Sequence, residues 1–436
     1  IQIIAQLTDE YGYYSSGESF SISDPNEVWI MEMIGKGPVV LKDKDIKKLK
    51  ETGAKFPYNK GALWVAIRIP DGYISGHANQ ARITTFPLND PQNCLYSKDV
   101  ISFARERGFF KASKDEEFSF ADTYCPLDYG SIRFCDARVW CGFLRVNSSM
   151  TKYEKYITMG DVSARMPLYI KPDRKLTIAD VISLMRDHYE GTPLDMSKDL
   201  GGGPFNSPYR WRPMTWKVDN VDYCHERAVS TQQTGFSFVA QSRGWLPSQI
   251  GGIIWFSVDD SYSTVYVPMY CGMIRVPQSY AEGNGSLLEF SWDAAFWVFN
   301  FVSNFAYTRY SDMIKDIQKT QSELENYFFT SVPMIDKAAA DLYKTNPEAA
   351  REYITNFSVN QGDMTVAKWR KLGEYLFVKY MDGNIKIEKD GKFQKNGYTQ
   401  AAQPLHPEYP EKWYRAIIKD NGDALKMKKL QNEDSH

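Results

Sequence analysis

The sequence has little net charge and no long apolar run. Its 52 basic and 54 acidic residues nearly cancel, so it lacks the charge excess typical of proteins that bind nucleic acid or acidic membrane surfaces. No apolar stretch approaches the ~20 residues that a membrane-spanning helix needs. The densest stretch, residues 294–306, is interrupted by Asn300, Ser303 and Asn304 and predicts a buried helix. We therefore expect partners to include neither nucleic acid nor a membrane.

Cysteine is also sparse and shows no metal-binding pattern. Six cysteines are spread over 436 residues, and no two have Cys-x-x-Cys spacing, so a zinc site is not expected. They are too few for a disulfide scaffold in a chain of this length. Aromatic residues, in contrast, make up 14% of the sequence. This predicts a large aromatic core or, alternatively, an aromatic-lined cleft for a peptide or sugar.

Strand patterns dominate before about residue 290. Residues 18–23 alternate polar and apolar side chains, residues 24–26 are a turn sequence, and residues 28–34 are rich in strand formers, which together predict a hairpin. Further strands are predicted at 63–69, 73–78, 81–86, 227–232, 235–241, 252–258 and 264–270. Helices are predicted within 95–112, with Ser97 as N-cap, and at 177–186. Asp259 and Asp260 fall at a predicted hairpin tip, where aspartates are usually solvated.

Helical patterns dominate after residue 290. A long pattern at 290–326 is followed by shorter predicted helices at 335–345, 348–356 and 363–381, which Pro333, Pro347 and Gly362 separate. Strands first, a helical stretch, strands again and then helices predict an α+β fold. Periodicity alone leaves several α+β arrangements open.

A specific resemblance to a known protein family is found in four segments. They are residues 11–35, 63–83, 208–241 and 251–272, and the second reads LWVAIRIPDGYISGHANQARI. They resemble the cysteine dipeptidases of the N-terminal-nucleophile (Ntn) hydrolase superfamily, of the dipeptidase A type, which are similar to the penicillin V acylases. The resemblance implies an αββα sandwich of two antiparallel sheets between helical layers. Residues 1–290 would form the Ntn core without its N-terminal segment, with a helical and loop insertion at about 95–215. Residues 291–436 would form a helical C-terminal region and tail.

The resemblance also implies a reaction: hydrolysis of dipeptides without a metal or cofactor. In the superfamily the nucleophile is the mature N-terminal residue, here a cysteine. Ile1 carries no nucleophilic atom, so we expect an upstream segment of the same protein to supply the cysteine and to be a partner of this chain. A homo-oligomer is left open. Two alternatives to a dipeptidase remain: an amide acylase of the penicillin V or bile-salt type, and a non-catalytic binding protein that retains the fold. We expect a bacterial cell-envelope or periplasmic location, with the cytoplasm as the alternative.

Two residues are implied to be catalytic. Asn79 would donate its side-chain amide to the oxyanion of the tetrahedral intermediate, a contribution typically worth ~3 kcal/mol; alternatively it caps a turn. Arg227 would lower the pKa of the nucleophilic thiol by favouring the thiolate; alternatively it forms an ion pair with Glu226, Asp222 or Asp219.

Two further residues are candidates for substrate binding. Arg82 could hold a substrate carboxylate with both ends of its guanidinium group, although a salt bridge at the edge of the core explains it as well. Trp211, with its neighbours Tyr209 and Trp216, could line a dipeptide cleft or could simply pack the connecting segment in which they lie.

Overall fold

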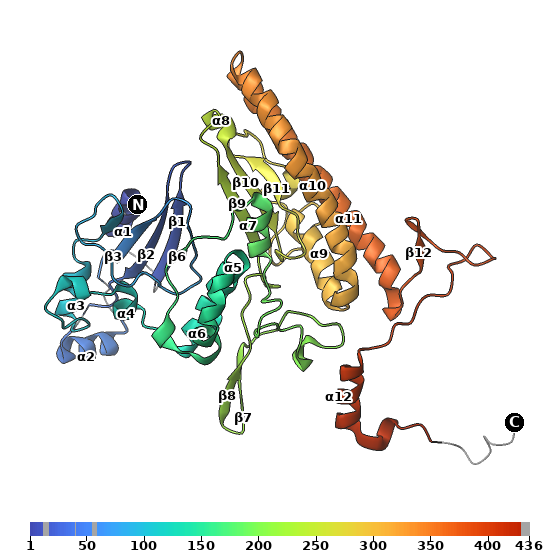
Figure 1. Cartoon of the computed structure of the whole chain (residues 1–436), viewed down its shortest axis with the longest axis horizontal. Helices are drawn as coiled ribbons and strands as arrows, with labels where there is room; N and C mark the ends of the chain where they lie inside the picture. The colour runs from blue at the N-terminus through green and yellow to red at the C-terminus, as the bar shows by residue number, and fades with distance from the viewer. Residues whose placement is uncertain (12–16, 40, 55–58, 429–436) are drawn as a thin grey trace. The chain divides into compact units, whose positions relative to one another are not determined.

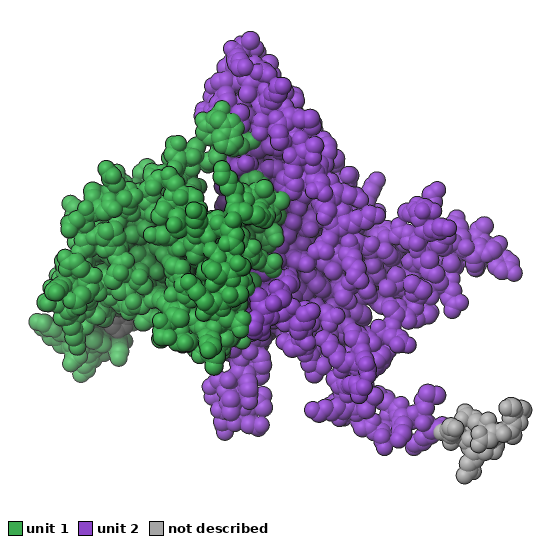
Figure 2. Space-filling view, viewed as in Figure 1, with its two compact units in different colours: residues 1–184, 242–245 green, residues 185–241, 246–436 purple. Residues whose placement is uncertain are grey.

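The computed structural model of the chain describes residues 1–11, 17–39, 41–54 and 59–428. Contacts divide the chain into two compact units (Figure 2): unit 1 contains residues 1–184 and 242–245, and unit 2 contains residues 185–241 and 246–436. Both units combine helices with antiparallel strands (Figure 1), which confirms the predicted α+β class. Among the described residues, no helix is both long and apolar enough to cross a membrane. The predicted domain organisation, with its boundary at residue 290, stays a prediction.

Unit 1 is built on a four-stranded antiparallel sheet in the order β1-β2-β3-β5. Its strands are β1 (Gly17–Ser23), β2 (Val28–Gly35), β3 (Ala62–Ile69) and β5 (Cys94–Tyr96). The predicted first hairpin is confirmed, because β1 pairs with β2 from Gly17 opposite Ile34 to Ser23 opposite Val28. Asp24 closes its turn by accepting hydrogen bonds from the backbone N–H groups of Asn26 and Glu27. Residues 12–16 of the segment 11–35 lie outside the described residues.

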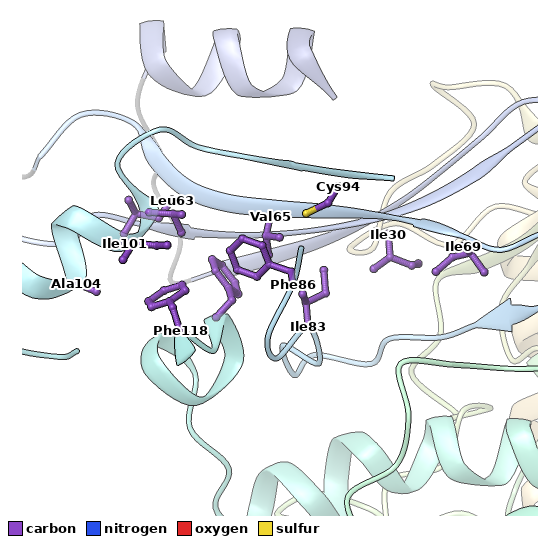
Figure 3. Packing of buried hydrophobic residues seen from close by; sticks show 12 residues of the cluster. Ile30, Leu63, Val65, Ile69, Ile83, Phe86, Cys94, Ile101, Ala104 and Phe118 are labelled. Carbon is purple, nitrogen blue, oxygen red and sulfur yellow. The ribbon is translucent and has the colours of Figure 1, made fainter. Parts of the chain in front are cut away.

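Both faces of this sheet are apolar. One face packs into the cluster drawn in Figure 3, where Leu63 and Val65 of β3 meet Phe86, Phe118 and other buried side chains. The opposite face gathers Trp29, Met31 and Met33 of β2. Unit 1 also contains a short pair of strands, β4 (Ile74–Ser75) with β6 (Tyr169–Ile170). Its helices are α1 (Gln2–Tyr11), α2 (Asp43–Thr52), α3 (Val100–Glu106), α4 (Phe120–Tyr124), α5 (Ala137–Val146), α6 (Glu154–Met159) and α7 (Ile178–Met185), the last ending one residue into unit 2.

Unit 2 combines a three-stranded antiparallel sheet, in the order β11-β10-β9, with long helices. The strands are β9 (Phe236–Ser242), β10 (Gly252–Val258) and β11 (Val267–Tyr270), and the helices are α8 (Ser248–Gly251), α9 (Ala295–Tyr307), α10 (Tyr310–Tyr343), α11 (Pro347–Tyr380) and α12 (Glu411–Asn421). Two hairpins complete it: β7 (Thr215–Val218) with β8 (Val221–Cys224), and β12 (Glu388–Lys389) with β13 (Lys392–Phe393). Trp255 of β10 packs against Phe329 of α10.

Several predicted elements are wrong. Of residues 73–78 and 81–86, only Ile74 and Ser75 form a strand, and residues 227–232 form none. Ser97 caps no helix; its hydroxyl instead accepts a hydrogen bond from the backbone N–H of Trp64, and the helix begins at Val100.

The helical region breaks at other places than the sequence predicted: the pattern at 290–326 is divided between α9 and α10, whereas α10 runs through Pro333 and α11 runs through Gly362. A Cβ atom on Gly362 would lie 2.4 Å from a side-chain carbon of Pro277. This glycine therefore permits a close approach within unit 2 rather than ending a helix.

Candidate active site

Asn79 lies in unit 1, in the loop that follows β4. Its backbone is in the left-handed region, with φ = 64°, which asparagine tolerates better than most residues. Arg138 of α5 donates a 2.7 Å hydrogen bond from Nη2 to the Asn79 side-chain oxygen Oδ1, and the same Nη2 lies 3.2 Å from the backbone oxygen of Ala78. Because arginine only donates hydrogen bonds, the atom of Asn79 that faces it must be the oxygen. The amide nitrogen, Nδ2, is then the other end of the group.

Asn79 opens onto a cavity of about 730 Å³. Its lining brings together chemically different groups from the sheet, the loop and two helical segments: Glu18, Glu32, His77, Asn79, Cys125 and Arg138. In the described part of the chain, the hydrogen bond of the Asn79 side chain is the one that its oxygen accepts from Arg138, and Nδ2 makes none. The cavity therefore contains an exposed, neutral and directional hydrogen-bond donor.

A buried carboxyl group supports the loop that carries Asn79. Glu32, in the middle of β2, is 1% exposed, and its two oxygens accept hydrogen bonds from the backbone N–H groups of Arg82 (2.6 Å) and Ile83 (3.0 Å). Burial raises the pKa of Glu32 to about 7, against the opposing effect of those two hydrogen bonds. Glu32 thus fixes the end of the loop, and it is a titratable group in the cavity wall.

Arg82 is buried beneath the same loop. Its guanidinium group donates to the backbone oxygens of Gly76 (2.7 Å) and Pro167 (2.8 Å), and its Nε lies 3.4 Å from Asp136. Both charged side chains of this pair are 2% exposed. The salt bridge that the sequence offered as the alternative is present, and the guanidinium group is occupied by protein atoms. Contact between Arg82 and substrate stays a prediction.

Arg227 and Trp211, the other two predicted site residues, lie in unit 2. Arg227 is half-buried, and its backbone oxygen accepts a 2.6 Å hydrogen bond from the hydroxyl of Tyr189. Together with Arg210 and Arg212, Arg227 lines a small cavity of about 20 Å³. Trp211 is 64% exposed, and its ring meets Tyr307 edge-on at 5.9 Å. Their predicted roles, thiol activation and substrate binding, stay predictions.

Asp259 and Asp260 are not solvated turn residues, which corrects the interpretation from sequence: they are 1% and 0% exposed. Asp260 accepts hydrogen bonds from the hydroxyls of Tyr209, Tyr307 (3.0 Å) and Ser230 (2.9 Å). Asp259 accepts one from Asn300 of α9 at 2.8 Å. Burial, followed by repulsion from Asp260, raises the pKa of Asp259 to about 7. The pair therefore ties the end of β10 to the helical layer.

The cavity residues that were missed from the sequence include Glu32, Cys125 and Arg138. The sequence does contain an indication for Glu32, since a single charged residue inside the apolar run of residues 28–34 requires a partner when it is buried. It contains none for Arg138, because 59 residues separate that residue from Asn79. Cys125 is half-buried in the cavity wall, and its backbone oxygen accepts a 2.6 Å hydrogen bond from Gln80.

Comparison with known proteins identifies one matching family and several similar proteins. The sequence matches the model of Peptidase family C69 over residues 1–323. A probable dipeptidase of Salmonella dublin is 27% identical over 274 residues, which are 62% of this chain and 51% of that protein. A probable dipeptidase of Latilactobacillus sakei is 22% identical, covering 88% of this chain and 70% of the relative. Probable dipeptidase B of Streptococcus pyogenes serotype M1 is 20% identical, with 88% and 68% covered. The chain thus spans between about half and 70% of the length of these relatives.

Proposed function

Because the chain belongs to peptidase family C69, we propose that it forms the larger part of a cysteine dipeptidase whose nucleophile lies in an upstream segment of the same protein. The relatives named as probable dipeptidases support dipeptides as the substrate class. The observation that carries the proposal is the amide of Asn79: Arg138 binds its oxygen, which leaves Nδ2 as the group that Asn79 can offer as a donor at the cavity it lines. A neutral, directional N–H group at a cavity is the kind of donor that stabilises an oxyanion.

The proposed reaction has two steps. The thiolate of an N-terminal cysteine attacks the peptide carbonyl carbon, and the carbonyl oxygen becomes an oxyanion that accepts a hydrogen bond from Asn79 Nδ2. The α-amine of that cysteine takes the thiol proton before the attack and passes it to the leaving nitrogen when the intermediate collapses and the C–N bond breaks. Water then hydrolyses the thioester and restores the thiol. Arg227 would favour the thiolate, and the exposed ring of Trp211 would contact the substrate.

We also propose the finer fold, an Ntn αββα sandwich. The β11-β10-β9 sheet supports it: the buried side of β10 packs on the long helix α10, while Phe236 and Phe238 of β9 are 60% and 48% exposed. A large apolar face on a sheet is typical of one that another layer covers. A structure of the full-length protein tests this, since a layer covering both phenylalanines is expected.

A dipeptidase and an acylase differ in which groups of the substrate they recognise. A dipeptidase binds a free α-amine and a free carboxylate, whereas an acylase needs an apolar acyl pocket. Hydrolysis of a free dipeptide and of its N-acetyl form by the full-length protein would be compared. The proposal predicts faster turnover of the free dipeptide. Preference for the blocked form would favour the acylase, and hydrolysis of neither would favour a binding protein that retains the fold.

A further inference from the structure

We propose that Arg138 is a positioning residue that determines which end of the Asn79 amide faces the cavity. This inference rests on the proposed function of Asn79 as an oxyanion donor. A primary amide has a donor end and an acceptor end of nearly the same shape, and rotation of the group by half a turn exchanges them. In the wrong orientation Asn79 would present its oxygen to the oxyanion and repel it. A residue that recognises only one end is therefore needed.

Arg138 has the properties required for that task. Its guanidinium group donates hydrogen bonds and never accepts them, so it can bond to Asn79 Oδ1. If the amide rotated, the N–H groups of Nδ2 would face the N–H groups of the guanidinium, and two donors cannot form a hydrogen bond. The guanidinium group is itself held in place: Nε donates to the backbone oxygen of Phe134 at 2.9 Å, and Nη2 reaches both Ala78 and Asn79. The orientation of the amide is thus fixed by a side chain with little freedom to move.

The helix that carries Arg138 is also unusual at this point. Residues Ser131–Asp136 form a π-helical segment that leads directly into α5, and π-helical turns inside helices occur frequently at functional sites. Asp136 ends the segment and pairs with Arg82, while Arg138, two residues later, binds Asn79. One helix junction therefore holds the loop of residues 76–82 at two places.

The positive charge of Arg138 adds a second effect. A hydrogen bond from a cation to Oδ1 withdraws electron density from the amide, and donors in such a chain of hydrogen bonds become stronger. Asn79 Nδ2 is therefore a better donor to an oxyanion than an isolated amide would be. Both effects act through Asn79, and neither requires Arg138 to touch the substrate.

A double-mutant cycle in the full-length protein tests this route of action. Asn79→Gly should lower kcat about a hundredfold, and Arg138→Ala should lower it about tenfold or more, both at nearly unchanged KM. If Arg138 acts through Asn79, adding Arg138→Ala to Asn79→Gly should change kcat by less than about twofold. Guanidinium ion added to Arg138→Ala should restore part of kcat, and should restore none in the double variant.

Arg133→Ala is the matched control, because Arg133 lies in the π-helical segment that leads into the helix of Arg138, and its guanidinium group reaches the backbone oxygens of Ile157 and Thr158. Its kcat should be unchanged. Arg138→Lys keeps the charge but not the planar fork and covers the case in which Arg138→Ala does not fold; it too should lower kcat. Losses that multiply in the double variant, or normal kcat in both Arg138 variants, would overturn the role of Arg138 alone. Normal kcat in Asn79→Gly would overturn the oxyanion role, and this inference with it.

Discussion

The sharpest prediction concerns replacement of Asn79 by residues that separate donation from backbone geometry. Because φ is 64° at this position, Asn79→Ala would add backbone strain of about 1 kcal/mol or more to any effect on catalysis. Asn79→Gly avoids this strain, and Asn79→Asp keeps the shape of the side chain. Aspartate would still accept the hydrogen bond from Arg138, as a carboxylate, but it has no N–H to offer.

The expected magnitude follows from the loss of one oxyanion donor, about 3 kcal/mol, or on the order of a hundredfold in kcat. Asn79→Asp should lose more than Asn79→Gly, because its negative charge faces the developing oxyanion. KM and the urea unfolding midpoint should hardly change in either variant, and Asn206→Gly, at another asparagine with positive φ, should leave kcat unchanged. Steady-state kinetics on a free dipeptide measure this. Normal turnover in Asn79→Asp, or a loss confined to stability, would refute the reasoning and favour a turn cap.

Three other predictions address the remaining groups. Arg82→Met should destabilise the protein by about 3–5 kcal/mol in urea unfolding, because it leaves Asp136 buried without a counter-ion; a higher KM with unchanged stability would instead show substrate binding. Asp259 has a pKa of about 7 when folded and ~3.9 unfolded, so its contribution to stability is lost as pH rises from about 4 to 7. Asp259→Asn should reduce that pH dependence and stabilise the protein at pH 8 by up to ~4 kcal/mol; unfolding at several pH values measures it, and an unchanged pH profile would contradict it. Arg227→Lys should slow thiol alkylation at constant pH, since Lys lacks the planar fork; an unchanged alkylation rate would remove Arg227 from thiol activation.

The parts of the fold that the sequence predicted are those with a local signal. The alternation in residues 18–23, the turn at Asp24 and the apolar run of residues 28–34 gave the first hairpin, with its bounds close to those of β1 and β2. Residues 81–86 have the same kind of pattern but form no strand, because the backbone N–H groups of Arg82 and Ile83 bond to the Glu32 side chain instead of to a neighbouring strand. The side chain of Glu32 thus takes the place of the hydrogen bonds that a neighbouring strand would make.

The helical breaks and the buried aspartates were mispredicted for a related reason. Gly362 is typical of a helix end, yet the close approach of Pro277 explains it. Asp259 and Asp260 are typical of a solvated turn, yet Asn300 and tyrosines that are distant in sequence surround them. Each exception depends on a tertiary contact that local patterns do not contain.

In the candidate site, too, the sequence indicated what local patterns contain and missed what tertiary contacts determine. The resemblance led to Asn79, and the structure places that residue on a cavity. The partner that orients its amide, Arg138, comes from a helix 59 residues later, and no spacing rule links the two. For Arg82 the sequence offered both a carboxylate-binding role and a salt bridge, and only the structure shows its guanidinium group bound to Gly76, Pro167 and Asp136.

The central claim is that an upstream N-terminal cysteine performs the chemistry, and labelling with a thiol alkylator tests it most directly. The full-length protein would be treated with iodoacetamide until dipeptide hydrolysis stops, and peptide mass spectrometry would locate the label. Cys125→Ser is the necessary control, because Cys125 lines the same cavity as Asn79 and could block it when alkylated. We predict that the loss of activity follows the extent of labelling of an N-terminal cysteine, with equal inactivation of wild type and Cys125→Ser. Full activity after that cysteine is labelled, or inactivation that disappears in Cys125→Ser, would contradict the account.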